Sequence, residues 1–155
     1  MNARLAISAA VVAVCAACTP AAPPALTTAE VQQFVRDYAA AANAANASKV
    51  MEMVLREQSV SSIFAGKIDR GWEAIRSATD ATLSRPNRAQ VALGMINVTP
   101  LAPDAALAVG TMNFIGSHQI GNMTFESLPG AFTIVVKRTP EGLRLIHEHY
   151  SVRAP

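Results

Sequence analysis

The chain has 155 residues and a formal net charge of +2, and only 15% of its residues are charged. Soluble domains average about 25% charged residues. The length fits a single domain, and the lack of any block of basic residues argues against a nucleic-acid partner. Both cysteines, Cys15 and Cys18, lie near the N-terminus, so the remaining residues hold no disulfide and no thiol nucleophile.

Residues 1–17 have the layout of a secretory signal peptide, with a positive charge at Arg4 followed by the apolar residues 5–14. The ending Ala16-Ala17-Cys18 resembles the bacterial lipobox, in which the cysteine becomes the lipidated first residue. The alternative is ordinary cleavage without a lipid. The apolar run is shorter than the roughly 20 residues of a transmembrane helix. We therefore expect an exported protein, anchored by lipid on the periplasmic side of the bacterial cell envelope.

Residues 18–26, which contain three prolines, are predicted to form an extended tether, and residues 27–155 the folded domain. Thr27 and Glu30 form a capping-box pattern that starts a helix predicted to reach about residue 46. Ser48 is expected to cap a second, short helix. Residues 60–64 alternate weakly and predict a short strand, and residues 71–83 predict a third helix.

The remainder of the chain predicts strands at residues 89–98, 105–117, 131–138 and 143–152. Turns are expected at residues 100–104, near Gly121, at Pro129-Gly130 and at residues 139–142. Helices followed by antiparallel strands favour an α+β fold with the helices on one face of a sheet. Apolar residues occupy both faces of the first of these strands: Val91, Leu93 and Met95 alternate with Ala92, Ile96 and Val98. Because the second face also needs cover, we expect a homodimer.

Three segments in this order resemble the SnoaL-like branch of the nuclear transport factor 2-like superfamily over about residues 28–153. They are the Ala-rich helix from Tyr38 to Asn46, the helix start Gly71-Trp72-Glu73-Ala74-Ile75, and the final hairpin ending Leu145-Ile146-His147-Glu148-His149-Tyr150-Ser151. Asn46 and Leu143 depart from the family's usual Asp and Trp. The resemblance implies a cone-shaped fold with three N-terminal helices on a curved, mostly antiparallel sheet, and an apolar pocket. Both enzymes and non-catalytic binding domains share this fold, so the fold does not choose the function.

Isomerases of this family use a tyrosine on the first helix and an aspartate base on the strand after the second helix. The resemblance places Tyr38 at the tyrosine position and Ser62 at the position of the base. A serine hydroxyl without an activating group cannot remove a carbon-bound proton near neutral pH. We therefore expect no isomerisation by the family's route.

Alternation along the last strand places His147 and His149 on one face with Leu145 and Ser151, and Glu148 and Tyr150 on the other. If the histidines face the pocket, they could act as acid and base or join His118 in binding a metal. No carboxylate has ligand spacing to them, so we expect neither a metal nor a cofactor. By analogy with kinase association domains, the face with Glu148 and Tyr150 is favoured as the pocket side.

The expected ligand-binding residues are Phe34, Tyr38, Trp72, Ile134, Glu148 and Tyr150. The predicted function is a non-catalytic envelope lipoprotein that binds a small apolar molecule or a protein partner. One alternative is an isomerase, cyclase or dehydratase with Tyr38 as donor and Glu148, His147 or His149 as base; a purely structural dimer is another. An ionisable group in the interior within hydrogen-bond reach of Tyr38 would favour the enzyme.

Overall fold

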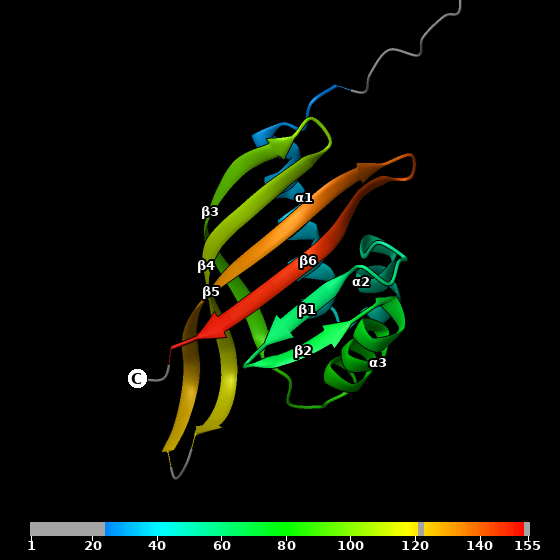
Figure 1. Ribbon diagram of the computed structural model, residues 1–155. Helices are drawn as coiled ribbons and strands as arrows, with labels where there is room; N and C mark the ends of the chain where they lie inside the picture. The colour runs from blue at the N-terminus through cyan, green and yellow to red at the C-terminus, as the bar shows by residue number, and fades with distance from the viewer. Residues whose placement is uncertain (1–23, 121–122, 154–155) are drawn as a thin grey trace, which may run out of the picture.

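The computed structural model describes residues 24–120 and 123–153 of the protein (Figure 1). The predicted signal peptide, Cys18, most of the tether and the turn at Gly121 lie outside these residues. Leu26, which the sequence assigned to the tether, is buried, and its backbone N–H donates to the Pro103 carbonyl at 3.1 Å. None of the described helices is long and apolar enough to cross a membrane.

Helix α1, Thr28–Asn43, begins with the predicted capping box. The Thr27 hydroxyl accepts from the Glu30 N–H at 3.2 Å, and the Glu30 carboxylate accepts from the Thr27 N–H at 2.9 Å. The helix buries one stripe of side chains at helical spacing, comprising Val31, Phe34, Val35, Tyr38 and Ala41. It ends before residue 46 because Ala45 adopts a left-handed φ of 55°.

Helix α2, Ala47–Met53, is capped by Asn46 and not by Ser48 as predicted. The Asn46 side-chain oxygen accepts from the Lys49 N–H at 2.9 Å, which is the standard role of an N-cap residue. Helix α3, Trp72–Leu83, starts at Gly71, whose φ of 83° is readily adopted only by glycine. Ile75 is the fully buried residue of this helix.

A short hairpin separates α2 from α3, where the sequence predicted a single short strand. Strand β1, Ser61–Phe64, matches the predicted short strand. It turns at Ala65 and Gly66, both with positive φ, into β2, Lys67–Arg70, which was not predicted. The sequence of β2 contains one apolar residue, Ile68, and that residue is exposed, so no alternating pattern marks the strand.

Four long strands complete a six-stranded sheet in the order β2-β1-β6-β5-β4-β3. They are β3, Gln90–Ala102; β4, Ala105–Ile120; β5, Met123–Thr139; and β6, Gly142–Val152. All neighbours are antiparallel except β1 and β6, which are parallel. The turn predicted at residues 100–104 is confined to residues 103–104, because Pro100 lies within the edge strand β3. The turn predicted at Pro129-Gly130 is wrong, because both residues lie within β5, at the point where β6 ends beside it. Proline is tolerated at such positions since a partner for its missing N–H is not required.

The sheet curves strongly, and α1 lies across its face behind β4, β5 and β6 (Figure 1). Phe64 on β1 and Phe114 on β4 are three strand spacings apart in the sheet, which corresponds to about 14 Å in a flat sheet. Their ring centroids are nevertheless 5.6 Å apart, edge to face. The side chains therefore converge on the concave face.

Two β-bulges change which side chains reach that face. The first lies between Leu93 and Ile96, so Val91, Leu93, Ile96 and Val98 all pack toward the core, while Met95 is 62% exposed. The predicted strict alternation of this strand is therefore wrong. The second bulge makes Ile146 an extra residue opposite Val135 and Val136. One extra residue reverses the alternation of the strand that carries it.

Helix α1 also covers the exposed edge of the sheet along β3. The Asn43 side chain donates to the Val91 carbonyl at 2.9 Å and accepts from the Val91 N–H at 2.7 Å, as a neighbouring strand would. Gln32 donates to the Ile96 carbonyl at 2.9 Å. These contacts block pairing of this part of the edge with another chain and fix α1 against the concave face.

Candidate functional site

A buried carboxyl group lies in the apolar interior between α1 and the sheet. Glu148 on β6 is only 5% exposed. Its Oε1 accepts from the Ser62 hydroxyl at 2.7 Å, and its Oε2 accepts from the Tyr150 hydroxyl at 2.7 Å. The hydroxyl of Tyr38, on α1, also interacts with this carboxyl group. We call these four residues the Glu148 cluster.

The parallel pairing of β1 and β6 positions half of this cluster. Ser62 and Glu148 are Cα partners in that pairing, so their side chains leave the sheet together toward the helices. Tyr150 follows Glu148 by two residues and points to the same face. Tyr38 reaches the cluster from the helix side, because it lies on the buried stripe of α1. The cluster is therefore held by a helix and two strands, with no loop residue.

Burial controls the protonation of the cluster. It raises the pKa of Glu148 above its ordinary value of 4.5, and the hydrogen bonds from Ser62, Tyr150 and Tyr38 offset part of that rise. Burial, together with the charge of Glu148, raises the pKa of Tyr38 and Tyr150 well above 10. The phenols therefore remain protonated and serve as hydrogen-bond donors at neutral pH.

Within the described residues, Glu148 forms no salt bridge with a lysine or arginine. A buried carboxylate without a cation is costly for folding, and its desolvation penalty amounts to several kcal/mol. Buried ionisable groups that interrupt an otherwise apolar core are concentrated at functional sites. The arrangement can accept a hydrogen bond from a ligand, donate one through a tyrosine, or hold a proton.

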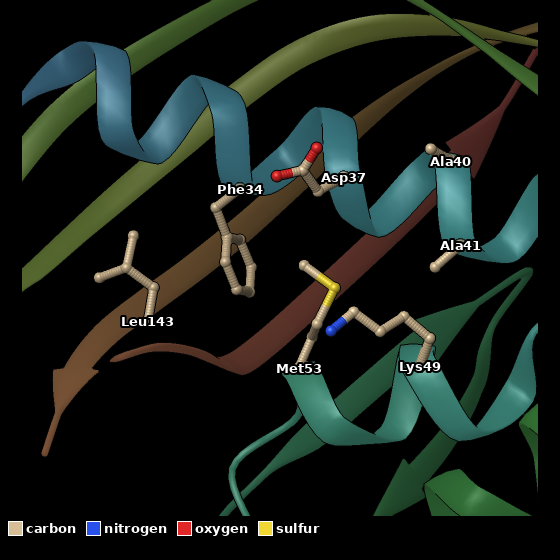
Figure 2. A pocket seen from close by; sticks show the side chains of 7 residues that line it. All are labelled: Phe34, Asp37, Ala40, Ala41, Lys49, Met53 and Leu143. Atoms are coloured by element: carbon tan, nitrogen blue, oxygen red, sulfur yellow. The ribbon is translucent and has the colours of Figure 1, made fainter. Parts of the chain in front are cut away.

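A groove of about 400 Å³ lies between α1 and α2 (Figure 2). Its walls are mainly apolar, with one charge on each side, at Asp37 on α1 and Lys49 on α2. Phe34 lines this groove and stacks on Tyr38, with ring centroids 6.5 Å apart and planes 9° apart. Phe34 therefore connects the groove to the Glu148 cluster.

The structure brings together Tyr38, Glu148 and Tyr150, three of the expected ligand-binding residues, and places Ile134 beside Glu148 on the neighbouring strand. Ser62, considered only as a missing base, is a direct partner of Glu148. The signal that sequence reasoning missed is the parallel β1–β6 pairing, because nothing local specifies which strand lies beside a short one.

Trp72 is not part of this arrangement. Its indole N–H donates to the Met51 carbonyl at 3.4 Å, and the guanidinium groups of Arg56 and Arg76 lie 4.9 and 5.3 Å from its ring centroid. These contacts place it at the junction of α2 and α3. The expectation that Trp72 lines the ligand pocket thus has no support in these contacts.

The two histidines of β6 lie on the opposite, outer face of the sheet, since His147 pairs with Val135 and His149 with Thr133. Leu145 was predicted to share their face, but it is fully buried on the inner face because of the bulge at Ile146. The side chain of His118 lies outside the described residues. Among the described side chains, no three His, Cys, Asp or Glu residues gather as metal ligands.

Known proteins share this fold. The sequence model of the SnoaL-like domain matches residues 31–155. No curated protein matches the chain. A nuclear transport factor 2-like protein from Salmonella enterica serovar Typhimurium superposes with a TM-score of 0.69 at 20% identity, covering 82% of this chain and 91% of its own.

Two further solved structures are similar. A provisionally assigned dehydratase of the NTF2-like family from Streptomyces avermitilis gives a TM-score of 0.70 at 17% identity, with 82% and 96% of the two chains covered. An uncharacterised protein with a cystatin-like fold from Caulobacter vibrioides gives 0.70 at 22% identity, covering 83% and 90%. At these identities the structures share the fold alone. The family match spans most of the chain and agrees with the curved sheet and its helices, so the chain belongs to the SnoaL-like domain family.

Proposed function

We propose that this domain binds a small, uncharged, mainly apolar molecule that carries one hydrogen-bonding group. The observation that carries the proposal is the Glu148 carboxyl group, buried among hydroxyl donors and adjacent, through Tyr38 and Phe34, to an open apolar groove. The groove accommodates the apolar part of the ligand. The Glu148 cluster recognises its polar group after Phe34 turns aside.

Binding without catalysis fits the hydrogen bonds of the cluster. Each oxygen of Glu148 already accepts from a hydroxyl, at 2.7 Å in both cases. These hydrogen bonds reduce the basicity of the carboxylate, because they favour its charged form and offset part of the rise in pKa that burial causes. The Glu148 cluster is well suited to selecting a ligand, because an analogue without the polar group forms no hydrogen bond with it and gains no affinity from it.

The test is a binding titration with matched pairs of small cyclic molecules, each pair differing only by a hydroxyl group. The wild-type protein should prefer the hydroxyl-bearing member. Glu148→Gln and Tyr38→Phe should reduce that preference by about three- to tenfold, which corresponds to the loss of one hydrogen bond, and leave binding of the hydrocarbon unchanged.

A second pair of variants tests the groove. Ala40 is exposed and lines the groove, so Ala40→Trp should fill it and weaken binding of both members of each pair. Arg36 is exposed on the same helix but does not line the groove, so Arg36→Trp is the matched control. Absence of binding to any compound, or equal effects of the two tryptophan variants, would contradict the proposal. Capture of a protein instead of small molecules would also contradict it.

Proton-transfer catalysis is the second candidate, and it is favoured by the interaction of Tyr38 with a carboxyl group of raised pKa. The histidines are removed from this role by their position on the outer face. Wild-type turnover of a β,γ-unsaturated ketone that is abolished by Glu148→Gln would establish this function. If the domain only binds its ligand, the wild type does not turn over this ketone. Ser62→Asp would add the carboxylate that the family's isomerases use at this position.

We further propose that the protein is an envelope lipoprotein with its lipid on Cys18, supported by Ala16-Ala17-Cys18 after an apolar leader. The intact mass of membrane-extracted protein should show diacylglyceryl on Cys18 and no residues 1–17. A water-soluble form with an unmodified N-terminus would contradict this.

Dimerisation through the outer face of the sheet is also proposed. Met95, Val109 and Ile115 are 62%, 41% and 49% exposed there, and apolar side chains grouped on one face favour association. Sedimentation at micromolar concentration should show a dimer that Val109→Lys dissociates. A wild-type monomer would refute the proposal.

A further inference from the structure

A second groove lies on the outer face of the sheet, where β1 and β6 run side by side. It measures about 300 Å³, and no residue of the Glu148 cluster lines it. Its apolar floor is formed by Leu55, Val135 and Ile146. Its polar lining consists of two hydroxyls, a carboxylate, an amine and an imidazole, from Ser59, Ser61, Glu57, Lys137 and His147.

Ser61 and His147 form a direct pair in this groove. They are Cα partners in the parallel β1–β6 pairing, and Ser61 Oγ lies 2.8 Å from His147 Nδ1. When the imidazole carries its proton on Nε2, the Ser61 hydroxyl donates to Nδ1. That is the arrangement in which an imidazole removes the proton of a serine as its oxygen attacks a carbonyl group. Both side chains are fixed by paired strands, so their separation does not depend on a loop.

The β-bulge at Ile146 is what places His147 in this groove. Leu145 faces the core, and uninterrupted alternation from Leu145 would turn His147 toward the core as well. The extra residue reverses this, so His147 faces outward beside Ser61. Bulges are over-represented next to active sites, where they re-aim a side chain.

We propose that Ser61 and His147 form a second site, which cleaves small carboxylic esters with an apolar acyl group. Ser61 Oγ forms a bond to the carbonyl carbon while its proton passes to His147 Nδ1. The ester C–O bond then breaks, and the leaving oxygen takes that proton. Water attacks the acyl-serine in the same way, which releases the acid and restores the Ser61 hydroxyl.

The surroundings of the pair support this chemistry and limit its rate. Lys137 brings a positive charge to the groove, which favours a carbonyl oxygen that becomes negative, and its ion pair with Asp104 is long at 4.0 Å. Glu57 brings a negative charge to the same groove, which opposes this stabilisation. In the part of the chain that the structure describes, no carboxylate bonds to the other ring nitrogen of His147. The pair is therefore a dyad, and slow turnover of activated esters is expected.

The experiment uses the full-length protein with 4-nitrophenyl acetate. Intact mass and peptide mapping should show one acetyl group on Ser61 during turnover. Ser61→Ala should abolish both the acetyl group and ester cleavage above background. His147→Gln should slow acetylation by roughly 10²- to 10⁴-fold, as expected for loss of a general base. His149→Gln and Ser151→Ala lie on the same face outside the groove and should leave the rate unchanged.

Acetylation on lysines with Ser61 unmodified would overturn the proposal, as would acetylation of Ser61 at the wild-type rate in His147→Gln. Circular dichroism checks that the variants fold. If His147→Gln fails to fold, Ser61→Ala still decides the question, because it removes one oxygen from a half-buried side chain: ester cleavage that persists in this variant contradicts the assignment.

Discussion

Replacing Glu148 with glutamine changes the charge of the interior site without changing its shape. One oxygen of the amide still accepts a hydroxyl, from Ser62 or from Tyr150, but the other hydroxyl now meets an NH₂ group. A hydrogen bond to a charged group contributes about 1.5–3 kcal/mol. Losing one such hydrogen bond destabilises the folded state. However, the neutral amide avoids the desolvation penalty of the carboxylate, which is several kcal/mol for a buried ion. At neutral pH the variant should therefore be at least as stable as the wild type.

The pH dependence of this difference is the more decisive quantity. Burial raises the pKa of Glu148 in the folded state above 4.5, so between 4.5 and the raised value the folded state binds more protons than the unfolded state. The stability of the wild type must then fall as pH rises through that window, by at most about 1.4 kcal/mol per pH unit. Glutamine does not titrate, so Glu148→Gln removes this fall.

Urea unfolding followed by circular dichroism between pH 4 and pH 8 measures both effects. Glu141→Gln is the control, because the hydrogen bond from Thr139 lowers the pKa of this exposed carboxyl group. Its contribution is present above pH 4.5 and is lost on acidification, which is the opposite sign. If the free energies of unfolding of wild type and Glu148→Gln differ by a constant amount across this range, the described environment of Glu148 is wrong.

Four further substitutions test the fold that positions the site. Thr27→Ala removes the cap of α1 and should lower the free energy of unfolding by about 1 kcal/mol in chemical denaturation. Gly110→Ala places a Cβ against the Met95 carbonyl oxygen and about 2.5 Å from the Phe132 ring, and should cost about 1–3 kcal/mol; an unchanged melting temperature would contradict these contacts. Asn46→Ala should cost about 1 kcal/mol, whereas Ser48→Ala should change stability by less than about 0.5 kcal/mol.

The sequence predicted which polar side chains share the interior better than it predicted the sheet around them. Alternation along the last strand correctly joined Glu148 with Tyr150, and the helical stripe of α1 correctly turned Tyr38 inward. Both patterns are local and depend on one element each. The partner Ser62 could not be predicted, since it comes from the non-local pairing of β1 with β6.

The bulge at Ile146 explains the remaining error on this strand. A single inserted residue has no reliable sequence signal. It nevertheless separates Leu145 from the histidines and places Leu145 on the same inner face as Glu148. Likewise Asn46 and Ser48 are both good N-cap residues, and the choice between them depends on the left-handed Ala45. Local propensity permits both, and the tertiary structure selects one.

A structure of the protein with the tightest-binding hydroxyl-bearing compound tests the proposed binding site. We expect the compound to fill the groove between α1 and α2, Phe34 to move from its stack on Tyr38, and the compound's hydroxyl to lie within hydrogen-bond distance of Glu148 or Tyr38. A compound bound elsewhere, with Ser62, Tyr150 and Tyr38 still in contact with Glu148 as described, would contradict the proposed site.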